Sequence, residues 1–153
     1  FVLTVPAGWA SHGDSKTANE EVMHAVLWEK FANALGTTSV EEPKLDETKF
    51  LVKTCTDLFA NPVTALGGLY AFEAQQPHTS KSKLDGLRAH YSSLPKSVEP
   101  YFEIHVDDVH EMAWIVERLE GKTEAEKLMA VNACEDVAKA LWNGLSGIHN
   151  MHC

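Results

Sequence analysis

The sequence has few cysteines, few basic residues and no long apolar run, and each shortage excludes a class of protein. Its 153 residues include only three cysteines, and these are far apart: Cys55, Cys134 and Cys153. An odd number at this spacing forms neither a disulfide framework nor a CxxC zinc site. We therefore expect a reducing compartment, either the cytoplasm or the interior of an organelle, and not secretion. No apolar run reaches the length of a membrane span.

Basic residues are outnumbered, with 13 Lys and Arg against 22 Asp and Glu and a formal net charge of −9. An acidic chain lacks the basic surface that non-specific nucleic-acid binding requires. The same charge disfavours binding to an anionic membrane surface. We therefore expect no nucleic-acid partner and no membrane attachment.

Strand and hairpin signals are also missing. Only residues 104–110 alternate, and their flanks keep a helical spacing, so we interpret them as helix. The sequence therefore predicts an all-α bundle of about six helices, spanning residues 20–35, 46–60, 62–76, 80–91, 100–120 and 123–145.

Several residues predict where these helices begin and end. Gly36 suits the residue after a helix, and Asn61-Pro62 is typical of an N-cap followed by the first helical position. Thr123 and Glu126 form a capping box. Further cap candidates are Asn19 for the first helix and Asp46 for the second.

The predicted bundle domain covers residues 19–149. Residues 1–18 are a segment of unclear structure, and residues 150–153 are a short tail. Because the sequence begins with Phe1, we expect that it is either processed or incomplete at its start.

Three of the predicted helices carry an acid or a histidine where an apolar residue is expected. On a wheel of about 100° per residue, His24 and Glu20 fall on the apolar stripe of the first helix. Glu73 falls on the stripe of the third helix. His105 lies on the stripe of the fifth, with Asp108 at its margin. That fifth stripe consists of Phe102, Val106, Val109, Met112, Ala113 and Val116.

A shared metal centre explains this coincidence most simply. A buried carboxylate is costly unless it is paired or bound to a metal. Carboxylates and imidazoles that project from facing helices are the ligands of di-iron and di-manganese bundles. The alternatives are ordinary: core histidines with hydrogen bonds, an ion pair at Glu73, and first-turn acids at Glu20 and Glu21. Gly67-Gly68 would let a neighbouring helix approach closely, and Cys55 and Cys134 are typical of small core residues.

Four sequence blocks together resemble the haem-oxygenase-like di-iron oxidases, a family that includes the TenA thiaminases and pyrroloquinoline quinone synthase. Within the family they also resemble the branch of the Chlamydia death-domain-associated protein. The blocks are HAVLWEKFANALG (24–36), ALGGLYAFEAQQPHTSKSKLDGLRAHY (65–91), YFEIHVDDVH (101–110) and ALWNGLSGI (140–148). The resemblance covers most of the chain.

The resemblance implies a haem-oxygenase-like helical bundle that holds two iron ions and uses O₂ to oxidise a small amino or carboxylic acid, or one of its own side chains. It places His24, Glu73 and His105 on family ligands, and Asp108 and His110 in the ligand helix. Lys83 matches a lysine used by the para-aminobenzoate branch, and Tyr70 matches the tyrosine of the signature. Glu73, Lys83 and Tyr70 are thus the candidate catalytic residues. The candidate metal ligands are Glu20, His24, Glu73, His105, Asp108 and His110.

Three departures accompany the resemblance. Thr17 stands where the family has its first glutamate, so Glu20 or Glu21 would serve instead. HVDDVH is two residues shorter than the family pattern, and its pairs His105/Asp108 and Asp107/His110 point about 140° apart on a regular helix. All could reach one centre only if the helix unwinds or contains a π-bulge. The family also has more helix before this segment.

These departures leave two alternatives to an iron-dependent oxidase. One is a metal-free relative that serves as a structural or accessory subunit, whose missing helices would leave an apolar surface for a partner to cover. The other is a TenA-like module that binds a small molecule. We expect either a homodimer or a subunit of a larger assembly.

Overall fold

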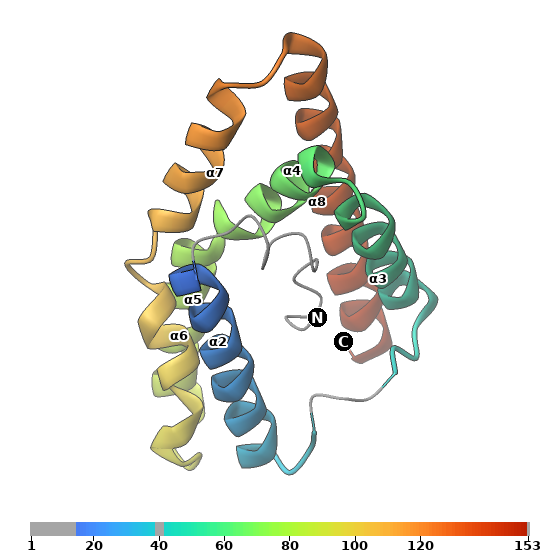
Figure 1. The fold of residues 1–153 in the computed structure, drawn as a ribbon. Helices are drawn as coiled ribbons and strands as arrows, with labels where there is room; N and C mark the ends of the chain where they lie inside the picture. Colours follow the sequence, from blue (N-terminus) through green and yellow to red (C-terminus); the bar gives the residue numbers. More distant parts are fainter. Residues whose placement is uncertain (1–14, 39–41, 153) are drawn as a thin grey trace. The chain divides into compact units, whose positions relative to one another are not determined.

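The computed structural model describes residues 15–38 and 42–152, with side chains from Val22 to Met151 (Figure 1). Every regular element in these ranges is a helix and none is a strand, which confirms the all-α prediction. The α-helices are α2 (Ser15–Ala34), α3 (Asp46–Phe59), α4 (Pro62–Glu73), α5 (Gln76–His90), α6 (Pro100–His105), α7 (His110–Glu120) and α8 (Glu124–His152), and a 3₁₀ helix, η1 (Lys96–Val98), precedes α6.

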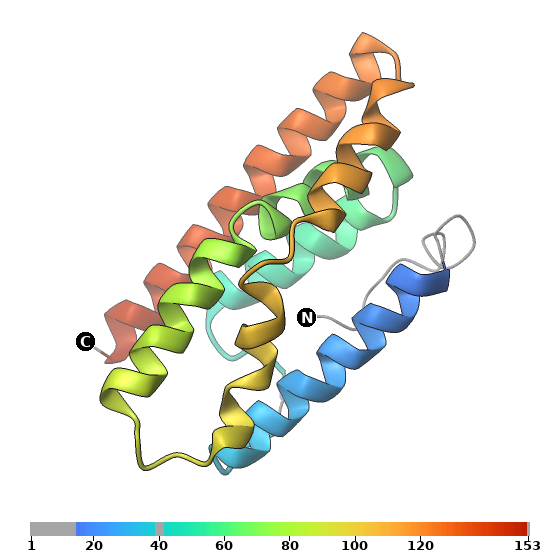
Figure 2. The same ribbon diagram turned by 90° about the vertical axis from the view of Figure 1, so that its left-hand side faces the viewer.

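The helices form two compact units. The first unit contains α2, α5, η1 and α6, from the described residues 15–38 and 75–109. The second unit contains α3, α4, α7 and α8, from residues 42–74 and from 110 onward. In the first unit α6 packs against both α2 and α5, and in the second α8 packs along α3 and α4 (Figure 2).

Small residues bring α4 and α8 close together in the second unit. A Cβ atom added to Gly67 would lie 1.8 Å from the carbonyl oxygen of Ala130, so only glycine fits there. One added to Gly68 would lie 2.5 Å from Cε1 of Phe59. The expected role of Gly67-Gly68 in a close helix approach is confirmed. Beside this contact Cys55, Ala71 and Val137 form an apolar core.

The predicted helix ends at Gly36, Asn61 and Thr123 are confirmed. Gly36 has φ 76°, and the amides of Gly36 and Thr37 bond to the carbonyls of Asn33 and Ala32, which is a Schellman motif. Asn61 Oδ1 accepts hydrogen bonds from the amides of Val63 (2.8 Å) and Thr64 (3.4 Å). Thr123 and Glu126 bond reciprocally as a capping box.

Other helix ends differ from the prediction. The first helix already includes Ser15, so Asn19 is not its cap, and Leu45, not Asp46, is the N-cap of α3. The helix predicted over residues 62–76 ends at Glu73, and Pro77 lies in the first turn of α5, where its missing N–H costs nothing. The last helix continues past Leu145 to His152.

The largest difference is a break in the helix that was expected over residues 100–120. Residues 106–109 are not helical and separate α6 from α7. Their sequence, Val-Asp-Asp-Val, explains this, because β-branched residues favour helix weakly and Asp carboxylates compete for backbone hydrogen bonds.

The break also changes which residues of α7 are buried. The predicted stripe placed Val109 and Val116 inward, but they are 56% and 45% exposed. Glu111 and Ile115 are buried instead, at 6% and 0%. A wheel assumes one continuous helix, so its prediction is wrong for Val109, Ala113 and Val116, which are exposed.

Candidate metal centre

Two predicted ligands, His24 of α2 and His105 of α6, lie against each other in the first unit. Their ring centroids are 4.4 Å apart, with the planes tilted by 55°. Both side chains are buried, with residue exposures of 9% and 3%. Two imidazoles that are far apart in the sequence thus share one buried position, as the wheel analysis predicts.

A backbone hydrogen bond sets the tautomer of His105. Its Nδ1 lies 2.5 Å from the carbonyl oxygen of Tyr101, one turn earlier on α6. A carbonyl only accepts hydrogen bonds, so Nδ1 carries the proton and Nε2 of the neutral ring has the lone pair. An Nδ1–H bond to a backbone carbonyl is the usual outer-shell contact of a metal-binding histidine.

Aromatic rings pack beside the two imidazoles. The Tyr101 ring lies 4.6 Å from that of His105 and 4.9 Å from that of Trp28. Phe31 and Phe102 extend the cluster, with a centroid separation of 5.4 Å. Edge-to-face rings at such distances pack favourably, and they place the histidines in apolar surroundings.

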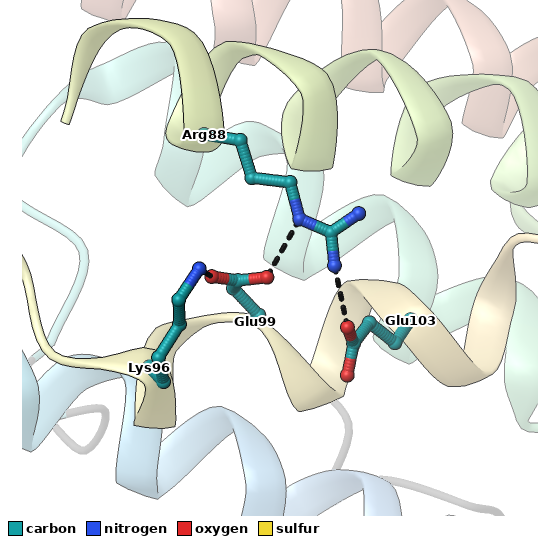
Figure 3. Close-up of polar contacts among 4 residues, drawn as sticks. All are labelled: Arg88, Lys96, Glu99 and Glu103. Atoms are coloured by element: carbon teal, nitrogen blue, oxygen red, sulfur yellow. Dashed lines mark hydrogen bonds and ion pairs between the residues drawn. The ribbon is translucent and has the colours of Figure 1, made fainter. Parts of the chain in front are cut away.

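An ion-pair network holds the first turn of α6 (Figure 3). Arg88 of α5 donates from Nε to Glu99 (2.7 Å) and from a terminal nitrogen to Glu103 (2.6 Å). Lys96 donates to the other Glu99 oxygen at 2.5 Å. The hydrogen bond from Lys96, followed by that from Arg88, holds the pKa of Glu99 below its ordinary value of 4.5. Glu99 therefore stays charged although it is buried, and it ties α6 to α5.

A second group of possible ligands follows the break. Asp108, His110 and Glu111 each offer one ligand atom, and these atoms lie within 4.8 Å of one another. Nε2 of His110 is 3.2 Å from Oε1 of Glu111. The three residues fall within four consecutive positions, so the local course of the unwound chain brings them together. Such unwinding is what the HVDDVH spacing requires.

Glu111 is the ligand candidate that sequence reasoning missed. On a continuous helix it falls opposite the apolar stripe, so nothing in its spacing predicts burial. The available signal was the tight cluster of acids and histidines between His105 and Glu111, combined with the poor helix formers inside it.

The other predicted site residues lie on α2, α4 and α5. Glu73 is half-buried in the last turn of α4, and Tyr70 is half-buried one turn earlier. Lys83 is exposed on α5, as an ordinary solvated lysine would be. Glu20 is in α2, but its side chain is outside the described residues. That these residues join the histidines at one centre stays a prediction.

The two cysteines with described side chains have no metal-site character. Cys55 is buried in the apolar core, and burial raises the pKa of its thiol to about 11. Burial also raises the pKa of Cys134. Neither thiol is ionised at neutral pH, and both pack as the small core residues that the sequence predicts.

A protein family described as iron-containing redox enzymes matches residues 16–142. No curated protein and no solved structure matches the chain. Among the described helices, none has the length and apolar character that crossing a bilayer requires.

Proposed function

Because the chain belongs to the family of iron-containing redox enzymes, we propose that it binds iron through His24 and His105 and oxidises a small molecule with O₂. The observation that carries this proposal is the buried imidazole pair, in which the Tyr101 carbonyl fixes the His105 tautomer. The donors suit the metal, because neutral imidazole nitrogen is a good ligand for iron.

Asp108, His110 and Glu111 supply further donors in this proposal. Carboxylate oxygens suit iron as well as imidazole does, and three donor atoms already lie within 4.8 Å of one another. We propose that the chain would hold two iron ions, with Glu73 and Glu20 as further ligands. The sequence resemblance supports Glu73, and the position of Glu20 on the apolar stripe of the first helix, one turn before His24, supports Glu20.

Bound iron would supply the redox chemistry with O₂, as metal cofactors generally do. The protein's own contribution lies in the surroundings of the ligands. Tyr101 holds the imidazole of His105 in one orientation and one tautomer. The rings of Trp28, Phe31 and Phe102 limit the access of water, and a low dielectric strengthens the interaction between ligand and metal ion. The Arg88–Glu99 pair fixes the helix that carries His105.

The substrate class rests on the resemblance to haem-oxygenase-like oxidases and their para-aminobenzoate branch. It points to a small amino or carboxylic acid, or to one of the protein's own side chains, with Lys83 and Tyr70 as catalytic candidates. The half-buried position of Tyr70 suits a role inside a bundle better than the exposed position of Lys83 does.

Iron content tests the proposal directly. The purified chain is loaded with Fe(II) without oxygen, desalted, and measured by mass spectrometry. We expect about two irons per chain, with most of the metal lost in His24→Ala and in His105→Ala. His90→Ala is the matched control, because His90 is an exposed histidine at the end of α5.

Two results would overturn the proposal. One is a folded wild-type chain that retains no iron, and the other is iron content in His105→Ala equal to that of His90→Ala. Circular dichroism shows whether each variant is folded, and His105→Gln keeps a polar side chain at the position if the alanine is not tolerated. Loss of iron in Glu111→Gln but not in Glu117→Gln would extend the ligand set to Glu111.

A further inference from the structure

Helix α8 has two different faces, each with the same periodicity. One face, which we call the inner stripe, is buried against the other helices of the second unit. It consists of small residues: Ala130, Ala133, Val137, Ala140 and Gly144. Two positions before each of these lies a residue of the outer stripe, which consists of Leu128, Val131, Glu135, Ala138 and Trp142 and continues to Leu145. A shift of two residues turns a helix by about 200°, so the stripes lie on nearly opposite faces.

The outer stripe is exposed, and it is apolar except at Glu135. Leu128 is 60% exposed, Val131 61%, Trp142 73% and Leu145 54%. Its steps alternate between three and four residues, which is the a/d spacing by which one helix packs against another. A helix that already buries one face in its own unit thus presents a second packing face outward.

We propose that the outer stripe binds the outer stripe of a second copy of this chain, in antiparallel orientation. The proposal is independent of iron. It rests on the fact that the stripe is complementary to itself, which a two-fold interface requires. When the two helices are centred between Asp136 and Val137, Leu128 faces Leu145 of the second copy and Val131 faces its Trp142.

The charges fit the same register. Glu135 faces Ala138 of the second copy and lies beside its Lys139. Within one chain Glu135 and Lys139 already pair at 2.6 Å, and their side chains are 61% and 66% exposed. In the antiparallel dimer each Glu135 lies beside Lys139 of the other copy, and the two-fold axis repeats this contact. A parallel pair would instead bring the two Glu135 residues together.

Light scattering of the full chain after gel filtration, over a concentration series, is the first test. We expect a mass of twice 16.9 kDa for the wild type. Trp142→Glu and Val131→Glu should give the mass of one chain, because each places a charge in the apolar interface. Met129→Glu is the matched control, since Met129 is 43% exposed but lies off the stripe.

A charge exchange tests the antiparallel register. Glu135→Lys should shift the dimer to higher concentrations, and the double variant with Lys139→Glu should restore it, because both contacts are then reversed. Circular dichroism establishes that each variant is folded. Leu145→Gln, a milder change, replaces any variant that is not.

Three outcomes would overturn the proposal. A wild-type chain that stays at the mass of one copy would mean that another part of the same chain, or a different protein, covers the stripe. Equal effects of Met129→Glu and Val131→Glu would place the interface elsewhere. A double variant no better than Glu135→Lys alone would exclude the antiparallel register.

Discussion

In the second unit, helices meet through residues with almost no side chain, whereas in the first they meet through rings and charges. Gly67 lies so close to Ala130 that a single added carbon would collide with the backbone. The first unit instead joins its helices through the Trp28 and Phe102 rings and the Glu99 carboxylate. Contact between backbones fixes the distance between two helices but places no polar or charged side chain between them. Contacts between rings and charges can hold a polar group such as His105 inside the protein.

The largest expected effect tests the ring contacts of the first unit. Phe102 is 7% exposed and packs against Phe31 and Tyr101. Phe102→Ala should lower the free energy of unfolding by about 3–5 kcal/mol, the usual cost of removing a buried Phe side chain. Urea denaturation measures the change. Phe50→Ala, at a phenylalanine 56% exposed on α3, is the control, and equal losses in the two variants would contradict the assignment.

A smaller effect tests the backbone contact of the second unit. Gly67→Ala should cost about 1–3 kcal/mol, because α4 and α8 must move apart to admit the methyl group. The control is Gly86→Ala on α5, where an added Cβ has nothing within 4 Å. That change should stabilise the chain by about 0.5–1 kcal/mol, since alanine favours helix over glycine. The same sign for both variants in thermal or urea unfolding would disprove the close approach.

The next prediction concerns the start of α4. Asn61→Ala should lower stability by about 1 kcal/mol, because the amides of Val63 and Thr64 lose their acceptor. Asn61→Asp keeps an acceptor oxygen and should be nearly neutral. The free energies of unfolding of the wild type, Asn61→Ala and Asn61→Asp are compared by chemical denaturation. Equal values for the two variants would refute the cap.

The smallest change at neutral pH is expected for the charges of the first unit, where the readout is pH dependence. The pKa of Glu99 is lower in the folded chain than its ordinary value of 4.5. Its contribution is therefore complete well above pH 4.5 and is lost as the pH falls through the folded pKa. Glu99→Gln should flatten the stability profile in this acid range. An unchanged acid limb, measured by urea denaturation from neutral to acid pH, would assign the effect to other carboxylates.

Local signals predicted most of the fold. Gly36, Asn61 and Thr123 act through atoms only a few residues away, so their roles can be predicted from spacing alone. Pro77 was harder, because a proline suits both the residues after one helix and the first turn of the next. The helix wheel correctly buried His24 and His105, since each lies on a single uninterrupted helix.

The burial of Glu111 could not be predicted in this way. Its side chain turns inward only because α6 ends at His105 and α7 begins in a new register. The low helix propensity of Asp107 and Asp108 made a break at these residues plausible. Whether the helix breaks there depends on the competition between a weak helix and tertiary packing, which the sequence alone does not reveal. His105, Asp108 and His110 could share one centre only if the helix unwound, and residues 106–109 are indeed not helical. That the three share a centre stays a prediction.

The break at residues 106–109 also determines what changes in length this part of the chain can absorb. In a continuous helix, removing two residues turns everything beyond them by about 200° and would point inward-facing side chains toward solvent. A non-helical segment has no fixed rotation per residue, so a helix that follows it can begin in whichever register buries its apolar face. His105 and His110 can therefore stand closer together than in the family pattern that the sequence resembles, while Ile115 remains buried. The segment separates the spacing of the candidate ligands from the packing of the helices, so the two can vary independently.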